Sequence, residues 1–85
     1  MRTAKLLNRI ATGAVTNVSF SDLVVLLDAL GFKEVGGRGS HRVFMRPGVI
    51  EILTLQVQRR QAKPYQVRQV AALVRRYNLQ LEDEP

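Results

Sequence analysis

The sequence predicts an α+β fold in which helices cover one face of a small antiparallel sheet. Three observations indicate it: an apolar helical period over residues 20–30, a change to period two from Phe32, and a return to the helical period after Pro64. A short extra helix is expected in front, over residues 4–12. Because each helix has one apolar stripe, the helices and strands are expected to bury these surfaces against one another in a sandwich.

The ends of the two longer helices are marked by local signals. Ser19 is expected to cap the first of them, with Asp22 three residues later as the other half of a capping box. Gly31 is expected to end this helix in the left-handed conformation. Pro64 suits the first turn of the last helix, and Asn78 is expected to end it in the same left-handed conformation.

Three strands are expected between these helices. Alternating residues predict them over residues 32–35, 40–46 and 49–57. Pro47 and Gly48 form a turn signal, so the last two strands are expected to form a hairpin. The glycines after the first strand are expected to make a flexible connection, and residues 56–62 are expected to be a polar, basic loop.

Length and composition limit the class of protein. Residues 1–85 are interpreted as a single domain, with an N-terminal helix and turn at 1–17 and an acidic tail at 82–85. The sequence has no cysteine and no apolar run long enough for a membrane span or a signal peptide. We therefore expect a cytoplasmic protein that does not associate with a membrane.

The positive charge of the chain, +6 overall, is concentrated in one part of the sequence. No acidic residue occurs between Ile52 and Arg76, whereas this stretch contains Arg59, Arg60, Lys63, Arg68, Arg75 and Arg76. Such a segment favours binding to a polyanion. Nucleic acid is the preferred interpretation, although an anionic membrane surface or an acidic protein would select the same charge pattern.

The segment GGRGSHRVFMRPG, residues 36–48, contains His41, the only histidine of the chain. Cleavage of RNA without a metal requires a group that accepts the 2′-hydroxyl proton, a role that suits histidine. It also requires cations that stabilise the charged phosphorane, a role that suits arginine. Gly39 and Ser40 offer N–H and hydroxyl donors to a phosphate. The alternatives are that His41 is an ordinary polar residue on a strand and that the glycines only permit a hairpin.

Among the nearby cations, Arg38 and Lys63 are the preferred candidates for phosphate contacts. In a regular strand Arg42 and Arg46 point away from His41, so they are expected to be solvated charges on the opposite face. Tyr65 is expected to pack its ring against the sheet. A metal site is not expected, because His41 has no cysteine and no nearby acid to complete it.

Two segments taken together resemble the HicA toxin family: GSHRVF, which follows a helix ending in LGF, and AKPYQVRQV, which opens the last helix. The resemblance covers residues 4–81. It implies an αβββα fold similar to the double-stranded-RNA-binding domain. It also implies a metal-independent endoribonuclease, an mRNA interferase toxin without a cofactor, whose protein partner is a HicB-type antitoxin and whose substrate is mRNA.

Applied to this chain, the resemblance implies that His41, the histidine of the GSH motif, is the catalytic residue. The RNA contacts are then expected from Arg38, Gly39, Ser40, Arg59, Arg60, Lys63 and Arg68. Many members carry a second histidine late in the third strand, in a proline–x–histidine segment, where this chain has LTLQVQRRQAKPYQVRQ. This difference keeps a second interpretation open, in which a non-catalytic module of the same fold binds duplex RNA by its shape.

Overall fold

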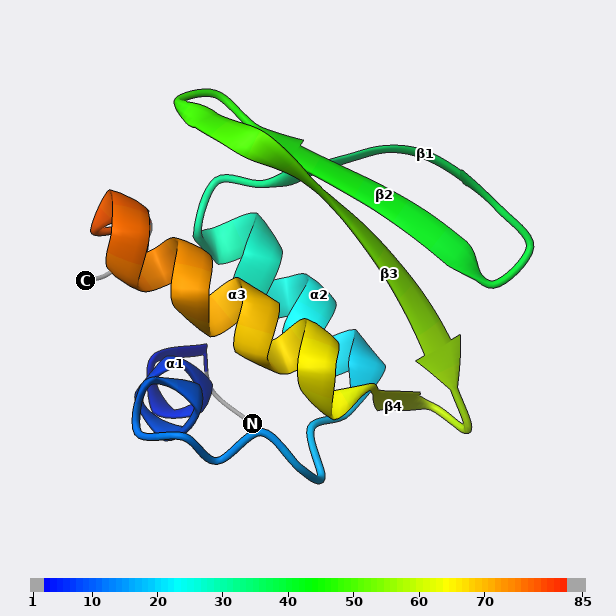
Figure 1. The fold of residues 1–85 in the computed structure, drawn as a ribbon, viewed down its shortest axis with the longest axis horizontal. Coiled ribbons are helices and arrows are strands. Elements are labelled where there is room, and N and C mark those ends of the chain that lie inside the picture. Colours follow the sequence, from blue (N-terminus) through cyan, green and yellow to red (C-terminus); the bar gives the residue numbers. More distant parts are fainter. Residues whose placement is uncertain (1–2, 83–85) are drawn as a thin grey trace.

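A computed structural model describes residues 3–82 and confirms the α+β fold. Its elements are α1 (Thr3–Ala11), α2 (Phe20–Ala29), β1 (Lys33–Arg38), β2 (His41–Arg46), β3 (Val49–Gln58), β4 (Gln61–Ala62) and α3 (Pro64–Tyr77). The strands form one antiparallel sheet in the order β1-β2-β3-β4. Helices α2 and α3 lie beneath one face of this sheet, and α1 packs against both helices on their other side (Figure 1). Residues 83–85 of the acidic tail lie outside the described part.

The predicted helix ends are confirmed. The Ser19 side chain accepts a hydrogen bond of 3.1 Å from the Asp22 backbone N–H, so it caps α2. Gly31 follows that helix with φ +95°, and Phe32 folds back over its last turn, where it is buried. Asn78 ends α3 in the left-handed conformation with φ 50°. None of the helices within residues 3–82 is long and apolar enough to cross a membrane.

The sheet differs from the prediction in two places. Strand β1 continues through Gly36 and Gly37 to Arg38, so these glycines are part of a strand and not of a flexible connection. The segment expected to be a loop forms a fourth strand, β4, which pairs with the end of β3. On its other edge, the Ala62 N–H donates to the Val18 carbonyl at 2.9 Å. Two residues are too short for an alternating pattern, so only their pairing partners define this strand.

The side chains of the central strands divide between two faces. Phe44 of β2 and Leu53 and Leu55 of β3 are buried against α2 and α3. His41 and Val43 alternate with Phe44 and therefore lie on the opposite face, called the open face below because no helix of residues 3–82 covers it. The side chains of the helix-covered face form part of the hydrophobic core, whereas His41 on the open face is exposed.

Two ion pairs lie on the helix-covered side of the sheet: one joins β1 to β2, and the other joins β3 to α3. Arg42 binds both carboxylate oxygens of Glu34, with Nε–Oε2 and Nη2–Oε1 distances of 2.8 and 2.6 Å. Glu51 accepts from Arg76 and from the Tyr77 hydroxyl, which is 2.6 Å away. The hydrogen bond from Arg42 lowers the pKa of Glu34, and the one from Tyr77 lowers the pKa of Glu51.

Acid is expected to weaken the fold through these two carboxyl groups. Because the pKa of each is below its ordinary value of 4.5 in the folded state, the unfolded chain binds their protons first as the pH falls. Their contribution to the free energy of unfolding is therefore complete above pH 4.5 and declines below it. Urea unfolding at a series of pH values should show a shallower acid decline for Glu34→Gln/Glu51→Gln. An unchanged decline would contradict this assignment.

Candidate catalytic and nucleic-acid interface

His41 begins β2 immediately after a two-residue turn formed by Gly39 and Ser40. The backbone φ of Gly39 is +58°, whereas the φ of Ser40 is not positive. This pattern is typical of a type II′ turn, in which glycine is favoured at the first central position. The turn places Arg38, the last residue of β1, directly across from His41.

Gly37 allows the two strands to approach closely beside the site. A Cβ atom at Gly37 would overlap the backbone carbonyl oxygen of His41 and would lie 3.0 Å from the Arg42 Cα. Its φ of +146° also disfavours a side chain. At Gly36 and Gly39 the corresponding Cβ atom would meet no atom of the described residues within 4 Å, apart from the adjacent residues in the chain. Gly37 is therefore required by packing, whereas Gly36 and Gly39 leave open space near His41.

A row of polar side chains crosses the open face at His41. Arg38 of β1 and Gln56 of β3 are its partners in the neighbouring strands. The Val57 N–H donates to the Ser40 carbonyl at 3.4 Å, so the adjacent His41–Gln56 pair is of the type without mutual backbone hydrogen bonds. In such pairs the Cα atoms are only about 4.5 Å apart and the side chains are close. On this face His41 is therefore flanked by its strand partners Arg38 and Gln56.

Lys63 extends this row from the start of α3. Its Nζ donates to the Gln56 Oε1 at 2.9 Å, although the two residues are separated by a turn and by β4. We call Arg38, His41, Gln56 and Lys63 the His41 row. Lys63 was a predicted cation, whereas Gln56, which links it to the strand position beside His41, was not marked by any sequence motif. The row therefore combines one imidazole, two cations and one amide on an accessible surface.

Arg59 and Arg60 form the turn between β3 and β4. Both have left-handed backbones, with φ 53° and 63°, as in type I′ turns that usually contain asparagine and glycine. The Arg60 carbonyl accepts from the Phe20 N–H at 2.9 Å, which ties the turn to the start of α2. Both arginines are exposed. Their turn and the Gly39–Ser40 turn lie at the same end of the sheet (Figure 1).

Arg68 lies apart from these residues. It is exposed on α3 and, with Arg75, lines a hollow against Ile10 and Gly13. Because α1 packs on the side of α3 that faces away from the sheet, this hollow is separate from the open face. The structure thus places Arg38 beside His41 and bonds Lys63 to Gln56, the other strand partner of His41, but it does not bring Arg68 to them.

Three expectations about neighbouring residues are wrong. Arg42 is not a solvated charge: besides binding Glu34, its guanidinium lies over the Phe20 ring, 5.2 Å from the centroid. Arg46 donates from Nε to the Leu30 carbonyl at 2.7 Å and so caps the end of α2. Tyr65 does not pack against the sheet, because it is 56% exposed. The two arginines therefore stabilise the covered side of the sheet.

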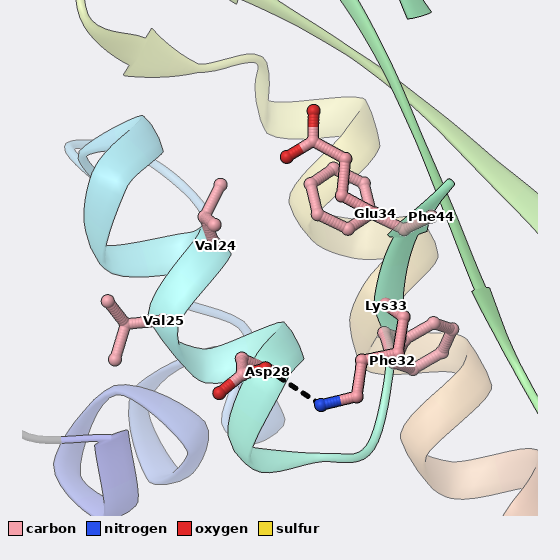
Figure 2. A pocket seen from close by; sticks show the side chains of 7 residues that line it. All are labelled: Val24, Val25, Asp28, Phe32, Lys33, Glu34 and Phe44. Carbon is pink, nitrogen blue, oxygen red and sulfur yellow. Dashed lines mark hydrogen bonds and ion pairs between the residues drawn. The ribbon is translucent and has the colours of Figure 1, made fainter. Parts of the chain in front are cut away.

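Another hollow, of about 350 Å³, lies between α2 and β1. Figure 2 shows its lining of apolar side chains with Asp28, Lys33 and Glu34, and the 3.3 Å ion pair between Lys33 and Asp28. Two carboxylates among its lining residues oppose the binding of a phosphate. No group of three or more potential metal-binding His, Cys, Asp or Glu side chains gathers within residues 3–82.

The fold and the site define a small α+β domain with a single accessible histidine at a basic end of its sheet. A family model described as HicA toxin of bacterial toxin–antitoxin systems matches residues 20–75, which include every strand and the whole His41 row. The chain therefore belongs to the HicA toxin family, as its sequence motifs indicated. No curated protein and no solved structure matches the chain.

Proposed function

We propose that this chain is a metal-independent endoribonuclease that cleaves mRNA as the toxin of its toxin–antitoxin pair. The observation that carries the proposal is the position of His41 on the open face, between Arg38 and the Gln56–Lys63 pair. An RNA strand can reach this position without any opening of the fold, because His41 is exposed. Family membership supports the same activity.

In the proposed reaction the His41 imidazole accepts the proton of a ribose 2′-hydroxyl. The 2′ oxygen attacks the adjacent phosphorus, and the bond from phosphorus to the 5′ oxygen of the next nucleotide breaks. The leaving oxygen takes a proton from solvent, which reaches the exposed site. Arg38 and Lys63 stabilise the negative charge of the phosphorane. The products are a 2′,3′-cyclic phosphate and a 5′-hydroxyl end.

The RNA backbone is proposed to cross the end of the sheet that carries both tight turns. Gly39 and Ser40 lie on one side of this path and Arg59 and Arg60 on the other, with the His41 row between them. The positive N-terminal end of α3 faces the same region, which adds to the attraction for phosphates. Arg68 lies outside this path and is expected to contribute less to affinity.

Replacing the strained turn by Arg59→Asn/Arg60→Gly is expected to stabilise the fold while weakening RNA binding. A left-handed backbone costs about 1–2 kcal/mol per ordinary residue, and asparagine and glycine accept it more readily. Loss of two phosphate contacts should reduce the slope of log affinity against log salt by roughly 1.4 for single-stranded RNA. Thermal unfolding and RNA titration at several salt concentrations measure both effects.

Arg68→Gln is the matched control for that variant, because it removes a positive charge away from the proposed path. It should change the salt slope less than either turn substitution alone. A turn variant that is stabilised but binds RNA with undiminished affinity would exclude Arg59 and Arg60 from the interface.

The proposed activity is tested with purified protein and end-labelled mRNA in EDTA. The expected products carry 2′,3′-cyclic phosphate and 5′-hydroxyl ends, and matched DNA should stay intact because it lacks the 2′-hydroxyl. Products with 5′-phosphate ends, or cleavage only after a divalent metal is added, would contradict the proposal.

A second candidate is an RNA-binding module without catalysis. The observation in its favour is that His41 is the only histidine in the chain, so no second imidazole can protonate the leaving oxygen. In this case the same incubation would retard the RNA without cutting it.

As the toxin of a toxin–antitoxin pair, the chain is proposed to act in the cytoplasm and to be inhibited by a HicB-type antitoxin. The proposed contact covers the open face around His41 with an acidic surface. Protection of this face from hydrogen exchange in the complex would support that arrangement, and protection confined to α1 would contradict it.

A further inference from the structure

We propose that Gln56 is a substrate-contacting residue whose amide nitrogen donates a hydrogen bond to a non-bridging oxygen of the scissile phosphate. This proposal rests on the proposed function for its effect on cleavage. It assigns a role to a residue that the sequence motifs do not mark, and it follows from the position and the hydrogen bonding of this side chain.

The first observation is the place of Gln56 beside the histidine. It is the direct partner of His41 across β2 and β3, in the closely spaced type of pair described above. A phosphate whose neighbouring 2′-hydroxyl contacts His41 would therefore lie within reach of the Gln56 side chain. Arg38 occupies the matching position on the other side of His41, in β1.

The second observation is that only the donor end of this amide is free. Lys63 Nζ occupies the Oε1 atom at 2.9 Å, whereas no residue in the range 3–82 accepts a hydrogen bond from Nε2. Because no buried side-chain nitrogen or oxygen in that range lacks a partner, Nε2 is accessible to solvent. A fixed, accessible N–H group selects an acceptor, and phosphate oxygens are the acceptors that RNA presents along its backbone.

The third observation is that a buried side chain fixes the backbone of Gln56. Gln66 is 2% exposed, and its Oε1 accepts from the Gln56 N–H at 3.2 Å. Its Nε2 donates to the Thr54 carbonyl at 3.3 Å and to the Tyr65 hydroxyl at 3.4 Å. The Gln66 amide thus pairs with the free edge of β3 as a further strand would. With Lys63 at its oxygen and Gln66 at its backbone, Gln56 is preorganised for a ligand.

The competing explanation is that Gln56 only anchors Lys63. Two substitutions separate the two roles. Gln56→Leu removes both the donor and the acceptor, whereas Gln56→Arg keeps N–H donors but cannot accept from Lys63. Loss of one donor to a developing oxyanion lowers rates by roughly 100- to 1000-fold. We therefore expect single-turnover cleavage in EDTA to fall about 100-fold for Gln56→Leu and less than about 10-fold for Gln56→Arg.

Thr54→Val is the control, because it alters the next pair on the same face without changing the backbone that Gln66 binds. Its cleavage rate should equal that of the wild type. A Gln56→Leu rate within about threefold of the wild type would overturn the proposal, as would equal large losses for Gln56→Leu and Gln56→Arg.

A binding measurement separates this proposal from the proposed function. Fully 2′-O-methylated RNA cannot react, and its titration into ¹⁵N-labelled protein should shift the side-chain amide signals of Gln56. If the wild type does not cut natural RNA but these signals shift, the nuclease proposal fails and the phosphate contact stands. If they stay unchanged while the backbone signals of Gly39 and Ser40 shift, the Gln56 contact is overturned whether or not RNA is cut.

Discussion

Gly37→Ala is expected to lower the free energy of unfolding by about 2–4 kcal/mol, a large fraction of the stability of a domain of this size. The added methyl group would overlap the His41 carbonyl oxygen, a backbone atom that cannot rotate away. The left-handed φ of Gly37 adds backbone strain. Strands β1 and β2 must therefore separate at the place where Arg38 and His41 face each other. Urea unfolding measures the loss.

Gly36→Ala is the matched control, one residue away in the same strand. Apart from its chain neighbours, its added Cβ meets no atom of residues 3–82 within 4 Å, and its φ is not positive, so a change within about 0.5 kcal/mol is expected. Equal losses for the two variants would show that alanine disturbs β1 in general. In that case the close approach at Gly37 would not be the cause.

His41→Ala is expected to reduce the single-turnover rate of RNA cleavage in EDTA by about 10²–10⁴-fold. The imidazole is the only group of the His41 row that suits proton abstraction near neutral pH. The side chain is exposed and has no hydrogen-bond partner within residues 3–82, so the free energy of unfolding should stay nearly unchanged. The affinity for 2′-O-methylated RNA should also be retained, because the cations that bind phosphate remain.

Met45→Ala serves as the control for this variant. Met45 is on the same strand and the same face as His41 and is 43% exposed, but it lies four residues from the row. It should cut RNA at the wild-type rate. Equal cleavage by wild type and His41→Ala would mean that another group, or a contaminating nuclease, carries the reaction.

The helices could be predicted because their signals are local. Ser19 bonds to a backbone group three residues away, and Gly31 and Asn78 adopt left-handed conformations that depend on their immediate neighbours. These helix ends need no knowledge of distant contacts. The Gly39–Ser40 turn, which brings Arg38 and His41 together, was predicted only as a flexible glycine connection followed by a strand that begins at Ser40.

The position of Gln56 beside His41 could not be predicted, because the pairing register of β2 and β3 changes along the hairpin. A regular hairpin closed at Pro47 and Gly48 would continue the Arg46–Val49 pair and place His41 opposite Thr54. A bulge gives β3 two extra residues between Val49 and Leu53, so that Gln56 is the partner instead. Since the shift is an even number of residues, Gln56 lies on the same face of β3 as Thr54, and only the partner of His41 changes.

The errors at Arg42 and Tyr65 have a related cause. The alternation of side chains correctly placed Arg42 on the face of β2 that is opposite to the face of His41. It does not tell which of these faces the helices cover. That face is the one with Phe44, and the partner Glu34 comes from the neighbouring strand. Tyr65 is exposed because Gln66, its polar neighbour, takes the buried position against β3. Both results depend on contacts between elements.

The most direct test of the central claim uses an RNA in which a single nucleotide keeps its 2′-hydroxyl and all others are 2′-O-methylated. In EDTA the wild type should cut only on the 3′ side of that nucleotide and leave a 2′,3′-cyclic phosphate, and His41→Ala should leave the RNA intact. Equal cutting of a fully 2′-O-methylated RNA would contradict attack by the 2′-hydroxyl and, with it, the role of His41 as the base.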